Sequence, residues 1–438
     1  MLGDVTRIAI VGGGIGGLSA AISLRRLPNV DVQIFEQTGA LREVGASIAL
    51  GPNGLRGLEE MGAINALDGE IAFRSEHGYP MVYRHWKTNE ILVKDEHSPS
   101  VYHRRHHTAR YFRPHLQQAL AENVPPDNLH LGKHLVNVTI RHETDDGAVL
   151  DFEDGSQYSA DLVIAADGIS STVRSTFLPE HKLSPTGLIA LRAVFDVSHI
   201  QDLIKENQNY RNLFWSMMGK GKFTVVGLGY DGYLDKSEGQ NESPWKGKIW
   251  DDEGNVEKFR EVYKDWHPSI TALLDRVPPG SMRVHPGRGS NEIPVPVHAG
   301  RIALLGDAFH PHGGALAAGG SLAIDDSIAL FLSLQYVQQL KLKSPNTNGI
   351  TGRQTPSLKL SASELSRALD LYAATRLSHV SRVFDVVERM KEGVARPGKR
   401  WDEEKIQMWA RNKTEVVWLH EHDVHKAFED AIELSTSS

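Results

Sequence analysis

Three short glycine-bearing segments each follow an apolar run of the kind that forms a buried strand. They are the glycine-rich segment 12–17, the pair Asp167-Gly168 and the pair Gly306-Asp307. Glycine lets the main chain approach a ligand closely, and the N–H groups of such turns bind phosphate, whereas a carboxylate accepts hydrogen bonds from sugar hydroxyls. The three segments therefore predict the binding of a nucleotide cofactor.

The first segment carries the spacing G-x-G-x-x-G in Gly12, Gly14 and Gly17. These glycines would allow a tight turn, a close approach to a pyrophosphate and the packing of a helix on a strand. The helix would begin near Ile15 and direct the positive end of its dipole at the phosphates. A second apolar run ends at Glu36, which is placed to accept hydrogen bonds from an adenosine ribose. The pattern predicts a βαβ unit for a dinucleotide, and FAD and NAD(P) both use such a unit.

The elements around these turns favour a mixed α/β fold. Runs ending at residues 166 and 305 predict further buried strands, and turns at the carboxyl ends of parallel strands converge on one crevice, which suits a long ligand such as FAD. Branched and aromatic residues at 188–195 and 223–229 predict a second sheet. We expect an FAD-binding domain from residues 1–75, 105–182 and 290–345, a substrate-binding β-sheet domain from 76–104 and 183–289, and a C-terminal helical region at 364–438.

Composition narrows the class of protein. The 438 residues predict about two domains. A formal net charge of −7 argues against a nucleic-acid partner, and the lack of cysteine excludes disulfides, thiolate metal sites and catalytic thiols. We see no apolar run long enough to span a bilayer and no signal peptide, so we expect no stable membrane insertion and a cytoplasmic monomer or homodimer.

The three motifs together resemble one family, the single-component (group A) FAD-dependent aromatic hydroxylases, and among them the salicylate hydroxylase-like monooxygenases. The motifs are the glycine fingerprint with Glu36, the segment 167–174 and the segment 306–311. The resemblance runs from Ile8 to about Leu334. It implies a Rossmann-like FAD-binding domain of the hydroxybenzoate-hydroxylase type, an antiparallel-sheet substrate domain and C-terminal helices.

The resemblance also implies roles for single residues. Gly12, Gly14 and Gly17 would hold the pyrophosphate, with Ile15 beside them, and Glu36 would hold the adenosine ribose. Further positions match family positions around the cofactor: Arg42, Gly45 and Ala46 in a loop near the flavin, Arg113 at a helix start, Asp167 as a support for FAD, Asp307 at the ribityl chain, and Gly319 and Gly320 at the isoalloxazine.

The implied reaction uses NAD(P)H as a transient electron donor and O2 as co-substrate. A flavin hydroperoxide then hydroxylates a phenolic or hydroxybenzoate-like ring, and the hydroxylation can be accompanied by decarboxylation. Such a ring reacts best as a phenolate, so the site needs a group that takes or stabilises the phenol proton. Arg192 matches a family arginine that could hold a carboxylate or phenolate. Tyr230 is the candidate that we place beside it as catalytic; Tyr83, Tyr102 and His103 are alternatives.

The chain departs from the family at two positions. Phe223 stands where many relatives carry histidine, which removes the expected base, and Gly314 stands where relatives have a proline facing the flavin. Histidine clusters at 103–107 and 420–425 suggest a metal site, but a solvated surface is the preferred interpretation and we expect no metal.

Other functions remain open on the sequence. Another FAD oxidoreductase, such as a non-aromatic epoxidase, an oxidase or a halogenase, would share the fold, although no two of the 8 tryptophans are two residues apart as the halogenase signature requires. An NAD(P)-linked dehydrogenase would leave the second and third glycine turns unexplained. A non-enzymatic binding protein on the same fold would purify without a flavin spectrum.

Overall fold

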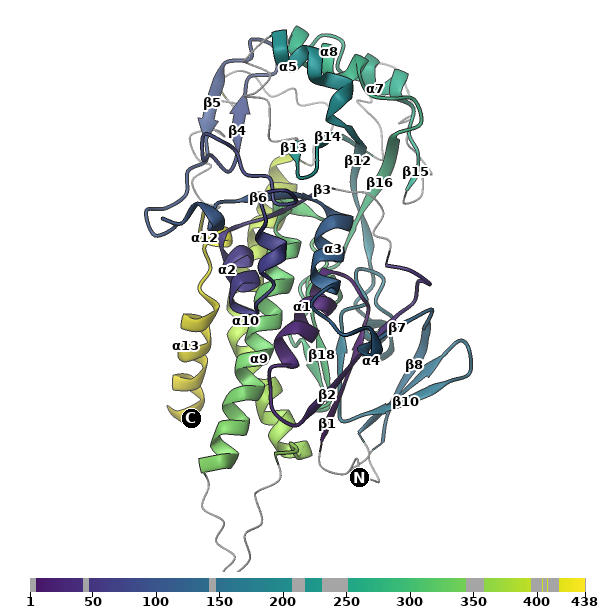
Figure 1. The fold of residues 1–438 in the computed structure, drawn as a ribbon, viewed down its shortest axis with the longest axis vertical. Helices are drawn as coiled ribbons and strands as arrows, with labels where there is room; N and C mark the ends of the chain where they lie inside the picture. The colour runs from purple at the N-terminus through teal and green to yellow at the C-terminus, as the bar shows by residue number, and fades with distance from the viewer. Residues whose placement is uncertain are drawn as a thin grey trace, which may run out of the picture.

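A computed structural model describes residues 5–41, 47–141, 147–206, 217–230, 251–343, 358–394, 404, 408 and 417–437. The molecule is elongated, with a large sheet and long helices towards one end and a second sheet capped by short helices at the other (Figure 1). The architecture is mixed α/β, with a parallel sheet and C-terminal helices as the sequence predicts.

The large sheet has six strands in the order β17-β18-β11-β1-β2-β7, and all neighbours are parallel except β17 and β18. Its central strands are runs of branched residues and alanine that are buried on both faces, as is usual for parallel sheets. The strands are β1 (Thr6–Val11), β2 (Val30–Glu36), β7 (Leu129–Leu131), β11 (Leu162–Ala165), β17 (Val297–His298) and β18 (Ile302–Leu304).

Helices cover this sheet and run along it. The long helices α9 and α10 lie side by side, and α13 packs against both (Figure 1). Proline at the first turn starts α2 and α3, where its missing N–H costs no hydrogen bond. The helices are α1 (Ile15–Leu24), α2 (Pro52–Glu60), α3 (Arg113–Ala121), α4 (Thr172–Phe177), α9 (Gly319–Lys343), α10 (Ala362–Val394), α12 (Val417–His420) and α13 (Val424–Ser437).

The second sheet is antiparallel, with the order β13-β14-β12-β16-β15. One of its faces packs against helices α5, α7 and α8 and forms a separate apolar core. The strands are β12 (Ser184–Asp196), β13 (Met217–Met218), β14 (Lys222–Tyr230), β15 (Asp252–Glu253) and β16 (Met282–Gly289); the helices are α5 (Gln201–Glu206), α7 (Val256–Val262) and α8 (Pro268–Asp275).

Smaller sheets complete the fold. Strands β8 (Leu135–Ile140), β9 (Ala148–Phe152) and β10 (Gln157–Ala160) form an antiparallel meander. Strands β3 (Ser47–Leu50) and β6 (Ala109–Phe112) pair with each other, as do β4 (Val82–Arg84) and β5 (Ile91–Lys94). The β4–β5 hairpin is therefore not hydrogen-bonded into the second sheet, and the domain limits drawn from the sequence stay a prediction.

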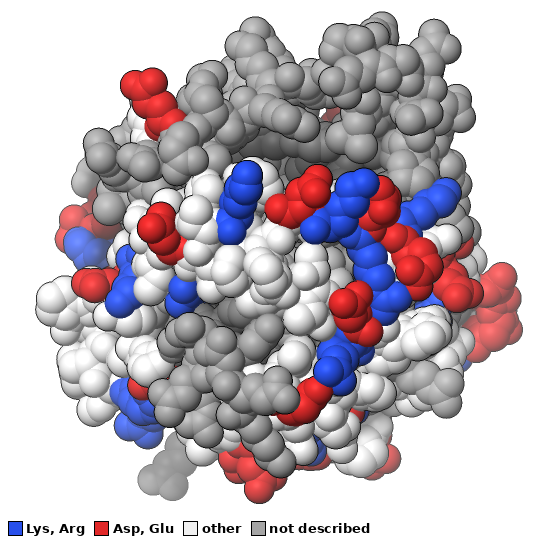
Figure 2. Space-filling view, turned by 90° about the horizontal axis from the view of Figure 1, so that it is seen from above, with Lys and Arg blue, Asp and Glu red and all other residues white. Residues whose placement is uncertain are grey.

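The outer surface mixes both signs of charge. Viewed from the end that carries α5, α7 and α8, lysine and arginine side chains lie among aspartate and glutamate side chains (Figure 2). Among the described residues, none of the helices is both long and apolar enough to cross a membrane.

Candidate active site

The first glycine turn joins β1 to α1 and is too crowded for any larger residue. Gly12 has a φ of +103°, and a Cβ atom built on it would lie 2.4 Å from the carbonyl oxygen of Ala166. A Cβ atom on Gly17 would lie 2.0 Å from the oxygen of Gly12. Gly14 caps α1 without a side-chain hydrogen bond, so Ile15 starts a helix whose first N–H groups face outward from the turn. The turn thus forms a backbone cradle of the kind that binds a pyrophosphate.

Glu36 lies at the end of β2 beside this cradle. One oxygen of its carboxylate accepts a hydrogen bond from the N–H of Gly13 at 2.7 Å, and the other accepts hydrogen bonds from Thr38. These contacts fix the carboxylate and leave lone pairs for a ribose, because each oxygen accepts more than one bond. The position agrees with its predicted role, which stays a prediction.

The second and third turns are held together by Arg174. This buried side chain on α4 donates hydrogen bonds to the backbone oxygens of Ile169, Asp307 and Ala308. Since β11 lies between β1 and β18 in the parallel sheet, the three glycine turns converge at one edge, as predicted. Asp167 accepts a hydrogen bond from the N–H of Val173, and its other carboxylate oxygen is buried with no hydrogen-bond partner in the described part of the chain. Burial raises the pKa of Asp167, and this effect is larger than the lowering of the pKa by hydrogen bonds to the carboxylate.

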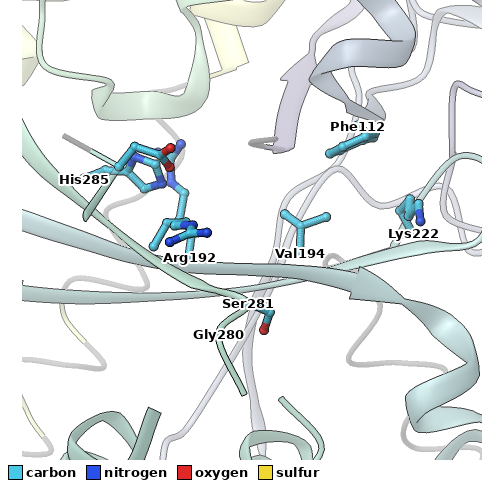
Figure 3. A pocket seen from close by; sticks show the side chains of 9 residues that line it. Phe112, Arg192, Val194, Lys222, Gly280, Ser281 and His285 are labelled. Carbon is cyan, nitrogen blue, oxygen red and sulfur yellow. The ribbon is translucent and has the colours of Figure 1, made fainter. Parts of the chain in front are cut away.

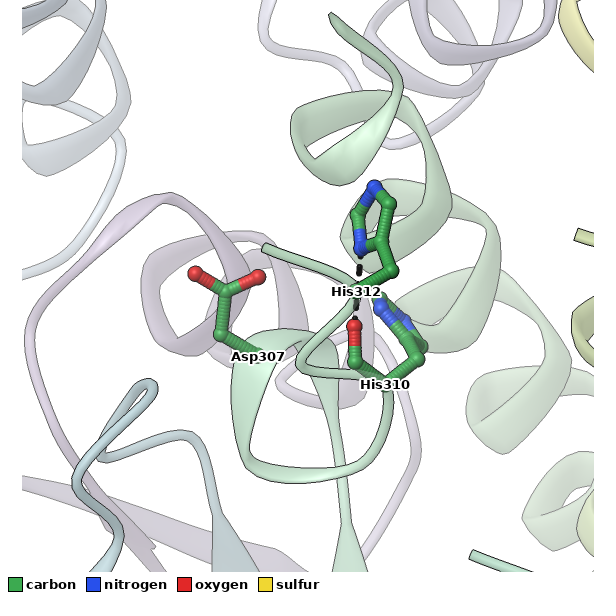
Figure 4. Close-up of side chains that lie close together, drawn as sticks. All are labelled: Asp307, His310 and His312. Atoms are coloured by element: carbon green, nitrogen blue, oxygen red, sulfur yellow. Dashed lines mark hydrogen bonds between the residues drawn. The ribbon is translucent and has the colours of Figure 1, made fainter. Parts of the chain in front are cut away.

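Polar groups also gather between the third turn and the start of α9. The exposed Asp307 lies near Gly319, where a Cβ atom would be 3.6 Å from its carboxylate. His312 donates its Nδ1–H to the backbone oxygen of His310 at 2.9 Å, and both rings lie to one side of the Asp307 carboxylate (Figure 4). The Nδ1 atom of His310 is buried and meets no hydrogen-bond partner among the residues that the structure describes. A cradle with an unpaired buried nitrogen fits a polar ligand, and Gly320, packed tightly on Ile48, opens the helix that faces it.

The remaining cofactor candidates lie in two places. Arg42, Gly45 and Ala46 fall outside the described residues. Arg113 is the first residue of α3, and Gln117 on the next turn donates a hydrogen bond to the backbone oxygen of Gly13 at 2.9 Å, which ties α3 to the first glycine turn. The sequence did not single out Gln117, because a buried amide on a helix has no distinctive spacing.

A cavity of about 400 Å³ opens on the face of the second sheet that is turned away from α5, α7 and α8. In Figure 3, Arg192 and His285 lie together at one side of it, Phe112 and Lys222 at the other, and Val194 between them. The full lining is Phe112, Arg192, Val194, Lys222, Asp251, Gly280, Ser281, Arg283 and His285. The combination of apolar walls and several cations suits an anionic ligand of small-molecule size.

Arg192 is the cation that stands out in this cavity. Its Nε atom is buried and has no hydrogen-bond partner among the described residues. Burial, and next the charge of Arg113, lower its pKa. A buried guanidinium beside other cations is costly unless an anion joins it, so Arg192 is suited to bind one.

Phe223 does not occupy the place that the sequence suggested. It pairs directly with Phe195 across β12 and β14 and is buried in the apolar core on the other face of the sheet. Because side chains alternate along a strand, Thr224 faces the opposite side to Phe223. The inference that Phe223 replaces a catalytic base is therefore wrong: this position cannot reach the cavity.

The tyrosine and histidine candidates do not line the cavity where they are described. Tyr230 is the last residue of β14, but its side chain lies outside the described part of the structure. Tyr83 donates a hydrogen bond to Asp95, the residue after β5, and Tyr102 is 78% exposed with the ring of His103 tilted against it. Sequence reasoning missed His285, which follows Met282-Arg283-Val284 and precedes the turn-like pair Pro286-Gly287.

Two groups of three side chains have possible metal-ligand atoms within 4.8 Å of one another: Asp307, His310 and His312, and Asp325, His379 and His422. The first group lies in the cofactor cradle. In the second, Arg376 donates to Nδ1 of His379, which places the proton of the neutral ring on Nε2, and the rings of His379 and His422 stack at 3.7 Å. The expectation that the chain holds no metal therefore stays a prediction.

Comparison with known proteins agrees with this geometry. The family model described as "FAD binding domain" matches residues 5–340. Among curated proteins, the chain is 30% identical over 341 residues to a salicylate hydroxylase of Pseudomonas putida (72% of this chain, 74% of the relative). It is 29% identical over 336 residues to a 6-hydroxynicotinate 3-monooxygenase of Pseudomonas fluorescens (76% and 83%). It is 28% identical over 460 residues to a 6-methylsalicylate 1-monooxygenase of Aspergillus terreus (98% and 92%).

A solved structure of a salicylate hydroxylase substrate complex is also similar, with a TM-score of 0.74, 21% identity and coverage of 98% of both chains. At this identity the likeness concerns the fold. It extends through the second sheet and the C-terminal helices.

Proposed function

The chain belongs to the FAD binding domain family, as an FAD-dependent aromatic monooxygenase that uses NAD(P)H and O2, and from this membership we propose that its substrate is a phenolic or hydroxybenzoate-like anion. The observation that carries the proposal is the buried Nε of Arg192, without a hydrogen-bond partner among the described residues, at a cavity of about 400 Å³. A carboxylate or phenolate would supply the missing charge and hydrogen bonds. Decarboxylation during hydroxylation is a variant of the same proposal.

Different residues would bind the cofactor and the substrate. Gly12, Gly14 and Gly17 would hold the pyrophosphate of FAD, and Glu36 and Asp307 its sugar and ribityl hydroxyls. When bound, FAD supplies the redox chemistry that joins NAD(P)H oxidation to O2 activation. The protein would orient the ring between Phe112 and Val194, neutralise its charge and exclude water. We also propose that the enzyme is cytoplasmic and works as a monomer or homodimer.

The proposal is tested by measuring NADH and NADPH oxidation by the flavin-loaded protein with a panel of aromatic acids and phenols. Product mass under ¹⁸O2 reports oxygen insertion, and release of carbon dioxide reports decarboxylation. We expect a hydroxylated acid to stimulate oxidation and to gain one labelled oxygen. If no aromatic anion stimulates oxidation, another FAD-dependent oxidoreductase, such as a non-aromatic epoxidase or oxidase, becomes the better interpretation.

Arg192→Met should raise KM for the aromatic anion by roughly 10- to 150-fold, because a bond to a charged partner contributes about 1.5–3 kcal/mol. The KM of Arg192→Lys should lie between those of the wild type and Arg192→Met, since lysine keeps the charge but not the bidentate geometry. The same Arg192→Met change removes a poorly compensated buried cation, so the melting temperature should stay level or rise. Arg367→Met, at an exposed position on α10, removes the same charge elsewhere and should change neither value. An unchanged KM in Arg192→Met would exclude this arginine as the anion-binding group.

Gly314→Pro should lower the fraction of NAD(P)H oxidation that yields product. Gly314 has a φ of +74°, whereas proline is fixed near −65°, so the loop after Asp307 must take another path. Gly314→Asn is the matched control, because asparagine tolerates the left-handed region. Product formed per NAD(P)H consumed is the measurement, and equal coupling in both variants would show that this loop does not border the oxygenation site.

A further inference from the structure

His285 and Arg192 occupy one face of the second sheet. In the pairing of β12 with β16, Arg192 lies opposite Arg283 and Ala190 lies opposite His285. Since alternate residues share a face, Arg192, Arg283 and His285 lie on the cavity side, with His285 diagonal to Arg192 at a Cβ spacing of about 7–8 Å. Figure 3 shows the two side chains next to each other.

His285 is also a group in the cavity that can accept a proton. Burial, and next the charges of Arg192 and Arg283, lower its pKa to about 4, so the ring is neutral at pH 7. The other charged groups that line or face the cavity are Lys222 on β14, Asp251 before β15 and Arg113 on α3. Of these groups, the imidazole of His285 and the carboxylate of Asp251 are the ones that offer a lone pair to accept a proton.

Substrate binding would strengthen this basicity. An anion at Arg192 offsets the cations that disfavour the charged imidazole, so the affinity of His285 for a proton rises when the site is filled. The base therefore becomes effective in the complex, where the proton must be removed.

The strand that carries His285 is anchored to the cofactor loop. Beyond His285, β16 continues to Gly289, where a Cβ atom would lie 2.9 Å from the backbone oxygen of Pro311. The next residue, Ser290, donates its N–H to the same oxygen at 3.0 Å. The position of His285 is thus fixed relative to the turn that follows Asp307.

From this geometry we propose that His285 is the catalytic base that takes the phenol proton of the bound aromatic substrate. The inference rests on the proposed function. The phenol O–H bond breaks and an N–H bond forms on one imidazole nitrogen, so that a neutral phenol and a neutral imidazole become a phenolate and an imidazolium. The new negative charge lies beside Arg192, and no electrons are transferred in the step.

The test uses the flavin-loaded protein with His285→Asn and His285→Gln, and with His134→Asn, at an exposed histidine, as the matched control. The first readout is the pKa of a bound chromophoric phenol, 4-hydroxy-3-nitrobenzoate, from its absorbance between pH 5 and 9. We expect the bound phenol to ionise at a lower pH in the wild type than in either His285 variant. Flavin content and circular dichroism identify a variant that fails to fold. If one of the two His285 variants fails to fold, the other one tests the proposal.

The second readout is kcat. We expect a loss of about 100-fold in the His285 variants with little change in KM, as is usual for removal of a general base. In the wild type kcat should fall as the pH drops through the pKa of His285 in the complex; in the variants it should instead rise with pH towards the pKa of the phenol. A fluorinated substrate with a more acidic phenol should lose less activity.

The failures can be told apart. If no aromatic anion binds, or Arg192→Met does not weaken binding, the proposed function fails. If binding depends on Arg192 but His285→Asn and His285→Gln leave the bound phenol and the kcat profile unchanged, only the role of His285 is overturned.

Discussion

Gly17→Ala is expected to yield a protein without bound flavin and without turnover. The added methyl group would lie 2.0 Å from the backbone oxygen of Gly12, far inside van der Waals contact, and backbone atoms cannot move aside as a side chain can. Relief of the clash would displace the turn and its N–H groups from the phosphates. Loss of two charge-assisted hydrogen bonds of about 1.5–3 kcal/mol each weakens FAD binding by more than about 100-fold.

The measurement is FAD affinity of the apoprotein by fluorescence titration, together with the flavin spectrum of the purified variant. Gly69→Ala is the matched control, because a Cβ atom there meets nothing within 4 Å. Circular dichroism separates a lost binding site from a lost fold. Binding of FAD by Gly17→Ala with the affinity of the wild type would show that this turn does not hold the pyrophosphate.

The elements with strong local signals were predictable. Pro52 and Pro114 mark the starts of α2 and α3, because proline is favoured in the first turn of a helix. The strands before the three glycine turns were equally clear, because buried parallel strands are short continuous apolar runs. Neighbouring places for these strands in one sheet follow from general rules of α/β topology.

The face of a strand was not predictable where the sequence does not alternate. Residues 223–226 are three apolar side chains and one threonine, so no period of two indicates that Phe223 faces the core and Thr224 the other side. Strand β16 contains Pro286 and Gly287, which are typical of turns, and this hid both the strand and His285. Only pairing with β12 fixes which residues share the cavity.

The network around Asp326 was hidden for another reason, since it joins residues far apart in the sequence. Asp326 on α9 accepts hydrogen bonds from Nε of Arg376 on α10 at 2.7 Å, from His310 at 2.8 Å and from the N–H of Gly306 at 2.9 Å. The side chains of Asp326, Arg376 and His310 are fully buried. Burial alone would raise the pKa of Asp326, but His310 and Arg376 outweigh it and hold the pKa below its usual range.

Arg376→Met should therefore lower the free energy of unfolding by about 3–5 kcal/mol, the range for breaking a buried ion pair by removing one partner. Denaturant titration measures it. The loss of stability should depend on pH. In the wild type, the ionised Asp326 stabilises the fold above its usual pKa, and this stabilisation is lost on acidification. In the variant, the unpaired carboxylate destabilises the fold at neutral pH, and protonation removes this cost. The difference should be largest near pH 7 and shrink towards pH 4. Lys426→Met, which removes an exposed pair with Asp430, should cost less than about 0.5 kcal/mol.

The same variant separates stability from cofactor binding. Because Asp326 holds the N–H of Gly306, the residue before Asp307, loss of Arg376 loosens the turn expected at the ribityl chain as well as the contact between α9 and α10. FAD affinity should fall in Arg376→Met and recover in part in the double variant with Asp326→Asn, whose neutral side chain needs no counter-charge. A stability loss of equal size at pH 4 and pH 7 would mean that packing of the long side chain, and not its charge, joins the two helices at the third turn.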